Sequence, residues 1–308
     1  WKHNSQEDNM EDKRFVSDHI RIALSSLAQK ILESDRTIFG ASANSNLTYG
    51  TLINRIIINF DDDFSLDESL FCLHGNEMSR IIRLKNEAID ILSSIKPKKY
   101  LTTIHNPNTS KYIKCLLETF ARLPFIEREK LILKTDIIHH IETALKNQKK
   151  LQLLYIGNSH LITPICIAPS REGTFQYLIG EENTALVSFR LSRIEKIRAT
   201  GKASLVSESM KKEVVENLSE FGATFITAPK TVIKVRFTDD GLKSYEYSVI
   251  HRPMHVAIEE NDIYVFNCSE LQALYFFFRF AKDAEIIEPQ SLRDKFRSLY
   301  RDGLNNYL

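Results

Sequence analysis

The fold is decided by four consecutive runs in the middle of the chain: LQLLYIG (151–157), HLITPICIAP (160–169), TFQYLIGEE (174–182) and ALVSFRLSRIEKI (185–197). In each run apolar and polar side chains alternate with a period of two, which is typical of strands with one buried face. Gly157 and the polar segments 170–173 and 181–184 separate the runs as turns do. The pattern predicts a small antiparallel β-barrel.

Upstream of these runs, the first sixty residues predict one strand followed by two helices. Ile20, Ile22 and Leu24 alternate with more polar residues, as in a half-buried strand. Apolar residues then recur at helical spacing over 27–39 and again over 47–60. The unit resembles a ribbon-helix-helix, whose single strand must pair with the strand of a second copy across a two-fold axis. This interpretation implies a homodimer.

The rest of the chain mixes helices and strands. Helical patterns over 66–95 and 110–150 predict a helical linker before the strand runs. After those runs we expect an α+β end domain with a helix at 208–221, strands near 231–238, 244–250 and 255–266, and helices at 269–281 and 290–307. Its segment FFFRF (276–280) is either a buried helix or a dimer face.

Composition excludes several classes of protein. The 308 residues are 43% hydrophobic, enough for a sizeable core, and 41 Lys and Arg oppose 40 Asp and Glu. The formal charge of +1 hides a basic centre, because residues 96–150 carry 12 basic and 5 acidic groups. No window is apolar enough to span a membrane, and the polar start gives no sign of secretion. The four distant cysteines fit reduced thiols, so we expect a cytoplasmic protein.

Enzyme motifs are missing from the sequence. It contains no HExxH, GxSxG, P-loop or GxGxxG pattern. His139 and His140 are adjacent, so they cannot form the i, i+4 zinc pair of a metalloprotease helix. We therefore predict no catalytic residues, no metal site and no cofactor.

The strand runs carry a family resemblance. The segment ALKNQKKLQLLYIG (144–157), then ITP (162–164), QYLIG (176–180) and FRLSRI (189–194), resembles the WYL domain of bacterial regulators. The name-giving Trp-Tyr-Leu reads Gln176-Tyr177-Leu178 here, and His160 stands where an arginine is usual. The segment 284–296 resembles the C-terminal extension of such proteins. The resemblance implies an Sm-like or SH3-like barrel whose basic groove binds nucleic acid or a nucleotide-like ligand.

A WYL domain behind a ribbon-helix-helix narrows the resemblance further. Proteins of this arrangement resemble the accessory proteins encoded beside type VI RNA-targeting CRISPR nucleases. The resemblance implies a cytoplasmic homodimer that acts in antiviral defence. It would bind single-stranded RNA through the WYL barrel and modulate an RNA-guided CRISPR nuclease.

Five residues are the candidates for RNA contact. Arg190 and Arg193 can grip phosphate through their guanidinium groups, provided that the chain bends at Leu191-Ser192 and turns both to one groove. The alternative is a pair of surface ion pairs with Glu195 and with Glu181 or Glu182. Tyr155 and Tyr177 either stack on bases or belong to the core. His160 either donates to phosphate or is a surface loop histidine.

A second hypothesis is a homodimeric transcription regulator that reads duplex DNA. His19 and Arg21 would face outward from the ribbon, and Asn46 and Thr48 would bring helix-start amides to a phosphate. The WYL domain would then sense a nucleotide-like effector. A third hypothesis is a dimeric interaction module without nucleic-acid affinity.

These patterns together predict an α+β multidomain chain. We place a ribbon-helix-helix domain at 1–62, a helical linker at 63–135, a WYL domain with an Sm/SH3-like β-barrel at 136–203, and a C-terminal dimerisation domain, the WYL extension, at 204–308.

Overall fold

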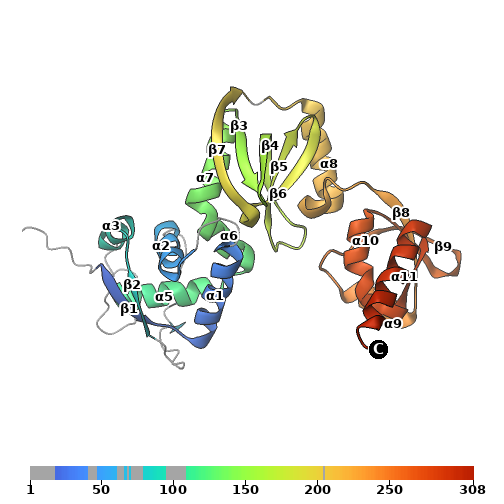
Figure 1. The fold of residues 1–308 in the computed structure, drawn as a ribbon, viewed down its shortest axis with the longest axis horizontal. Coiled ribbons are helices and arrows are strands. Elements are labelled where there is room, and N and C mark those ends of the chain that lie inside the picture. The colour runs from blue at the N-terminus through green and yellow to red at the C-terminus, as the bar shows by residue number, and fades with distance from the viewer. Residues whose placement is uncertain are drawn as a thin grey trace, which may run out of the picture. The chain divides into compact units, whose positions relative to one another are not determined.

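The computed structural model describes residues 18–40, 47–60, 66–67, 69–70, 79–94, 109–203 and 205–308. The chain divides into two compact units, residues 1–139 and 140–308. Within the described ranges, helices accompany three antiparallel sheets, so the α+β prediction is confirmed at this level (Figure 1). No helix in these ranges is long and apolar enough to cross a membrane.

The first unit repeats one arrangement of strand, helix and helix. The first copy is β1 (His19–Ala23), α1 (Ser26–Gly40) and α2 (Tyr49–Asn59), and the second is β2 (Ser79–Arg83), α3 (Asn86–Ser94) and α5 (Thr109–Arg122). Each element of the second copy begins 60 residues after its counterpart, at 79 against 19, 86 against 26 and 109 against 49. Buried residues recur at the same interval: Ile22 and Ile82, Leu24 and Leu84, Ala28 and Ala88, Leu32 and Leu92, Ile53 and Ile113, Ile56 and Leu116.

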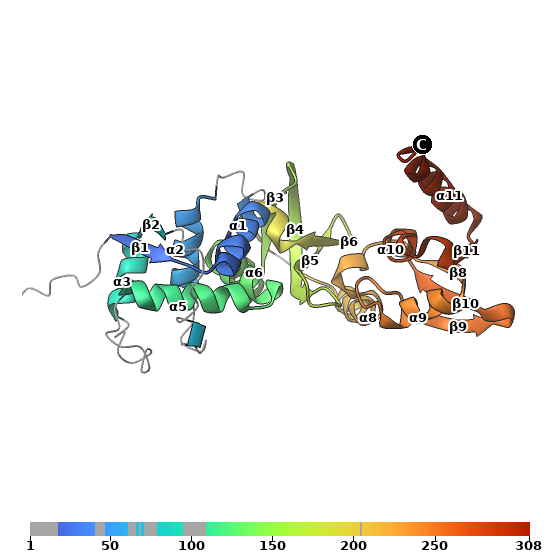
Figure 2. The same ribbon diagram turned by 90° about the horizontal axis from the view of Figure 1, so that it is seen from below.

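The two strands pair with each other inside the chain. β1 and β2 form one antiparallel ribbon, and the strands lie side by side in both views (Figures 1 and 2). The expectation that β1 needs the strand of a second copy is therefore wrong. Of the helices expected over 66–95, the structure has α3, whereas residues 79–83 form the strand β2 instead. The sequence did not predict β2 because this strand has five residues and only one of them, Ile82, is buried. So short a segment shows no periodic alternation of apolar and polar residues.

The second helix of each copy supplies a side chain that caps the start of the first helix in the other copy. Asn54 on α2 accepts a hydrogen bond from the backbone N–H of Lys85 at 2.7 Å, just before α3. Glu118 on α5 accepts from the backbone N–H of Ser25 at 2.6 Å and from its hydroxyl at 2.7 Å, just before α1. Because the Glu118 side chain is fully buried and also pairs with Arg122 at 2.9 Å, these bonds tie the two copies into one core.

Two further helical segments follow in the first unit: α6 (Phe125–Leu133) and a π-helical stretch (Lys134–Ile138). The next helix, α7 (His139–Lys146), belongs to the second unit except for its first residue. Arg128 on α6 binds Asp35 on α1 through two hydrogen bonds of 2.7 and 3.2 Å. Burial raises the pKa of the Asp35 carboxyl, and the facing guanidinium opposes that rise. The pair fixes α6 against the first copy.

The predicted strand runs form a five-stranded antiparallel sheet. Its strands are β3 (Lys149–Tyr155), β4 (Asn158–Pro169), β5 (Gln176–Glu182), β6 (Ala185–Arg190) and β7 (Ile194–Ala203). The order is β6-β5-β4-β3-β7, and within the described residues β6 and β7 do not pair, so the sheet is not a closed barrel. The last predicted run is two strands joined by a 3-10 turn, Leu191–Arg193.

A helix covers one face of this sheet. α8 (Glu208–Phe225) packs on β4, β5 and β6 (Figure 1), where Val214 and Ala223 meet Ala168 and Ile179. The helix kinks at Gly222, whose φ of 70° suits a residue without a Cβ. Because α8 buries these apolar side chains, their burial does not require the sheet to close.

The C-terminal sheet has the order β11-β8-β10-β9. Its elements are β8 (Thr231–Phe237), α9 (Asp239–Tyr247), β9 (His255–Glu259), β10 (Ile263–Cys268), α10 (Glu270–Phe277), β11 (Ala284–Glu288) and α11 (Gln290–Asn305). Phe266, Phe276 and Phe277 are fully buried in its core, so most of the FFFRF segment is core rather than a dimer face.

Two predictions in this part are wrong. The strand expected at 244–250 is largely the helix α9, which begins where the Thr238 hydroxyl accepts from the backbone N–H of Gly241 and where Asp239 and Asp240 favour the helix dipole. The single strand expected at 255–266 is a hairpin of β9 and β10. Asn261, with φ 61°, lies in the turn between them.

Candidate nucleic-acid interface

The turn between β6 and β7 positions the two candidate arginines. Arg190 ends β6, and Arg193 is the last residue of the 3-10 turn before β7. Leu191 and Ser192 are 0% and 1% exposed, so the turn is anchored in the core. The bend at Leu191-Ser192, which the two arginines need in order to share a groove, is therefore present.

Arg190 is held in a fixed position. Its guanidinium lies 3.2 Å above the centre of the Phe175 ring, and its Nε donates to the Ser192 hydroxyl at 2.8 Å. Tyr177 stands directly opposite Arg190 across β5 and β6, so both side chains lie on one face of the sheet. Burial raises the pKa of the Tyr177 hydroxyl, while the nearby charges of Arg190 and Arg193 oppose that rise.

Arg193 is the more accessible cation. Its side chain is exposed, and it forms no ion pair within the described part of the chain. Two of the three carboxylates considered as partners make other contacts: Glu195 accepts from the backbone N–H of Gly157 at 2.8 Å, and Glu182 pairs with His160. Arg193 is therefore available to a phosphate from solvent.

The other aromatic candidates cluster around Phe189. Tyr155 lies edge-on to Phe189 with ring centres 5.0 Å apart, and His160 lies 4.8 Å from the same ring. Neighbouring residues of a strand point to opposite faces, so this cluster lies on the other face from Arg190. His160 Nδ1 is 2.9 Å from Glu182 Oε2, and that carboxylate opposes the approach of a phosphate. The predicted set is thus divided between two faces.

Tyr177 and Leu178 lie on opposite faces of the sheet, as neighbouring residues of a strand must. Leu178 is fully buried, whereas Tyr177 is partly buried against a cluster that includes Ala223 of α8 and Ile226, which follows that helix. Gly180, two positions further on, lies where a Cβ would come within 2.9 Å of the Thr163 carbonyl oxygen. The QYLIG segment therefore combines a core strand with one partly accessible ring.

Further cations along β7 escaped the sequence analysis. Lys196 and Arg198 are exposed and stand opposite Leu154 and Gln152 of β3. Arg198 donates twice to the Gln152 side-chain oxygen, at 2.6 and 3.1 Å, and neither cation has an acidic partner among the described residues. Their alternation along one strand could have identified them from the sequence. The count of basic residues drew attention to the segment 96–150 instead. Of that segment Lys96, Lys98 and Lys99 lie outside the described residues, and Lys111 and Lys114 belong to α5.

The ribbon presents a second set of exposed basic side chains. His19 and Arg21 are exposed on β1, and β2 adds Arg83, which stands opposite His19. His19 Nδ1 is 3.1 Å from an oxygen of Asp18, and this contact lowers the pKa of the Asp18 carboxyl.

The start of α2 borders the same set. Thr48 caps α2 by accepting from the backbone N–H of Thr51 at 3.1 Å, whereas Asn46 lies outside the described residues. A depression of about 560 Å³ joins this helix start to Arg83 and Lys85. In the described part of the chain no cluster of histidine, cysteine, aspartate or glutamate is suited to a metal ion.

Comparisons with known proteins find a relative by structure only. No family model matches the chain, and no curated protein matches it. A solved structure described as a CRISPR Cas-related protein has a TM-score of 0.67 and 19% sequence identity, and the match covers 96% of both chains. Proteasome accessory factor B/C (PafBC) of Arthrobacter aurescens matches 74% of this chain and 37% of its own, at 16% identity and a TM-score of 0.31. The chain therefore shares the fold of a CRISPR Cas-related protein over almost its whole length.

Proposed function

We propose that the chain is a nucleic-acid-binding accessory protein that binds single-stranded RNA on its five-stranded sheet and modulates an RNA-targeting CRISPR nuclease. The observation that carries the proposal is the bend at Leu191–Arg193, which joins Arg190, held on the Phe175 ring at the end of β6, to the exposed Arg193 just before β7. The shared fold with a CRISPR Cas-related protein supports the nuclease setting.

The cations offer a path for a sugar-phosphate backbone. Lys196 and Arg198 are two residues apart on β7, which places their Cα atoms about 6.6 Å apart along the strand. Successive phosphates of an extended single strand have a comparable spacing. Arg193 continues the row at the turn, so three consecutive phosphates can each meet one cation.

Aromatic side chains supply the second element of single-strand recognition. Tyr177 is partly buried and lies opposite Arg190, so the exposed part of its ring can receive a base. Tyr155 can stack on a base only if that base reaches the opposite face of the sheet, where the cluster around Phe189 lies. His160 is already paired with Glu182, so it contributes less than the two arginines.

The salt dependence of binding tests this path. We expect wild-type protein to bind a labelled single-stranded RNA, with an affinity that falls steeply as salt rises. The double variant Lys196→Ala/Arg198→Ala should lower the slope of log K against log salt by about 1.4, because each single-strand phosphate contact contributes about 0.7. An unchanged slope would remove β7 from the path.

A second candidate function rests on the ribbon. β1 and β2 complete it within one chain, and Arg21 and Arg83 face outward, so a single molecule presents a whole two-stranded ribbon of the kind that fits a DNA major groove. The protein would then be a DNA-binding regulator whose sheet senses a nucleotide-like ligand. The variant Arg21→Ala/Arg83→Ala should abolish sequence-specific duplex binding without affecting the binding of RNA.

We also propose that the chain forms a homodimer through the edge strand β9. All five of its residues are exposed, and its outer edge has no partner strand within the described residues. Antiparallel pairing with a second copy about Ala257 would place Val256 opposite Ile258 and His255 opposite Glu259, which matches apolar with apolar and base with acid.

A further inference from the structure

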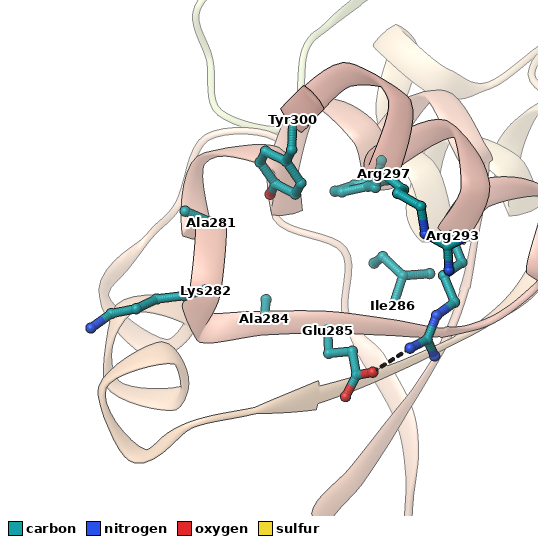
Figure 3. A pocket seen from close by; sticks show the side chains of 9 residues that line it. Ala281, Lys282, Ala284, Glu285, Ile286, Arg293, Arg297 and Tyr300 are labelled. Atoms are coloured by element: carbon teal, nitrogen blue, oxygen red, sulfur yellow. Dashed lines mark hydrogen bonds and ion pairs between the residues drawn. The ribbon is translucent and has the colours of Figure 1, made fainter. Parts of the chain in front are cut away.

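A pocket in the C-terminal region has no role in the functions proposed above. It has a volume of about 400 Å³ and lies between β11 and α11 (Figure 3). Ala284, Ile286 and Phe296 are buried residues that line it. Volume and lining fall in the range of small-molecule sites, which are mostly apolar with a few placed polar groups.

The rim of this pocket is positively charged. Arg293 and Arg297 line it together with a single carboxylate, that of Glu285, and Lys282 lies at the rim with its side chain extending away from the pocket (Figure 3). Glu285 is already neutralised from two sides, because it accepts from Arg293 at 2.6 Å and from Arg236 at 3.2 Å. An excess of positive charge therefore remains for an anion that enters.

Arg297 can turn toward such an anion at little cost. Its partner is Asp294, one turn away on the same helix at 3.1 Å, and both side chains are more than half exposed. Exposed pairs of this kind contribute little to stability. In Figure 3 the Arg297 side chain lies on the same side of the pocket as Arg293, so the two can reach a common phosphate.

An aromatic ring is fixed at the other end of the pocket. Tyr300 stacks on Phe278 with ring centres 4.7 Å apart and an interplanar angle of 10°, and its hydroxyl donates to the Phe278 carbonyl at 2.9 Å. Ala281, also at the rim, has φ 49° and ψ −112°, a conformation that costs an L-residue energy. Strain of this type is maintained only where the surrounding structure holds it in place.

From these observations we infer that the pocket binds a nucleotide, with the phosphate between Arg293 and Arg297 and the base over the apolar floor beside Tyr300. The same chemistry is offered by a free mononucleotide and by the phosphorylated end of a nucleic-acid strand. The pocket lies outside the five-stranded sheet, so this inference does not depend on the proposed RNA path.

Titration calorimetry with the full chain tests the site. The probes are AMP, GMP, CMP and UMP, with the matching nucleoside of each and inorganic phosphate as the two halves of the ligand. We expect at least one mononucleotide to bind about tenfold more tightly than either half, because only the whole nucleotide reaches both the cations and the floor. Binding of phosphate as tight as that of every nucleotide would contradict the inference.

The variant Arg297→Ala should weaken nucleotide binding about tenfold, and Lys282→Ala should weaken it less. Arg301→Ala is the matched control, since Arg301 is exposed on α11 outside the pocket lining. Thermal unfolding of each variant establishes that it is folded. If Arg297→Ala and Arg301→Ala bind the nucleotide equally well, or if no probe binds, the pocket is not a nucleotide site.

Oligonucleotide arms identify the source of the nucleotide. They use protein that carries Arg193→Ala, which removes a contact of the proposed RNA path. If the ligand is the end of a strand, a 5′-phosphorylated strand should bind more tightly than both the 5′-hydroxyl strand and AMP. That advantage should disappear in Arg297→Ala. Tighter binding of AMP identifies a free nucleotide.

Discussion

Arg21 and Ile81 stand directly opposite each other at the centre of the β1–β2 ribbon, and the same interval of 60 residues that separates them also relates the helices of the two copies. The centre of pairing therefore coincides with the axis of an internal repeat. One chain therefore carries both halves of a ribbon-helix-helix arrangement that would otherwise need two chains. The halves are free to diverge, as the different capping residues Asn54 and Glu118 show.

The cap that Glu118 provides should matter for stability. Glu118→Ala leaves the backbone N–H and the hydroxyl of Ser25 without their buried acceptor, so we expect the first unit to lose about 2–4 kcal/mol. Urea unfolding followed by circular dichroism measures the loss. Glu127→Ala, which removes an exposed pair with Lys130 and the acidic residue of the first turn of α6, is the control and should change stability by less than about 1 kcal/mol. Equal effects would show that the cap is not important.

The pair of Asp35 and Arg128 predicts a dependence on pH. Arg128→Leu leaves a buried carboxylate without its partner and should cost about 3–5 kcal/mol. Because burial raises the pKa of Asp35 above its unfolded value, its contribution to stability is greatest at low pH and falls as pH rises through the folded-state pKa.

Removing Arg128 raises the pKa of Asp35 further, so the deficit of Arg128→Leu should be larger at pH 8 than at pH 5. Unfolding free energies at both pH values check the prediction. The double variant Asp35→Leu/Arg128→Leu should recover most of the loss. A deficit that does not vary with pH would mean that Asp35 does not titrate in this range.

Gly180 and Gly201 give a matched pair of substitutions in the five-stranded sheet. A Cβ on Gly180 would meet the Thr163 carbonyl oxygen at 2.9 Å, whereas a Cβ on Gly201 would meet no atom within 4 Å. We expect Gly180→Ala to destabilise the protein by about 1–3 kcal/mol and Gly201→Ala to be nearly neutral. Thermal unfolding measures both, and equal melting temperatures would refute the close approach of β4 and β5.

A charged side chain introduced into β9 should prevent the proposed dimer from forming. Ile258→Asp places a carboxylate opposite Val256 in the proposed dimer, so the chain should elute as a monomer. Val232→Asp is the control, because Val232 is exposed on β8 away from the edge strand. Light scattering after size exclusion reports the mass. A dimer that survives Ile258→Asp places the interface elsewhere.

The sequence predicted the elements whose periodicity extends over many residues. The helices α1 and α2 and the strands of the middle sheet follow from long apolar patterns, and the bend beside Arg193 was anticipated as a requirement. β2 was missed because five residues carry little pattern and its stability comes from pairing with β1. The helix α9 was missed because its cap at Thr238 outweighs the alternation that follows.

The candidate site was predicted less completely than the fold. Arg190 and Tyr177 could be named from the resemblance, but only strand register shows that they are cross-strand neighbours. His160 could not be known to face Glu182, since the two are 22 residues apart in the chain. Which face a side chain occupies depends on register and bulges, and composition does not encode them.

In the proposed function, single-stranded RNA binds at the turn that carries Arg190 and Arg193. Fluorescence anisotropy with matched single-stranded RNA, single-stranded DNA and duplex DNA measures it most directly. We compare wild type, Arg190→Ala/Arg193→Ala and the control Arg301→Ala. We expect wild type and the control to bind the RNA more tightly than either DNA, and the double variant to lose at least about a hundredfold in affinity. RNA binding that the double variant retains, or a preference of wild type for duplex DNA, would contradict it.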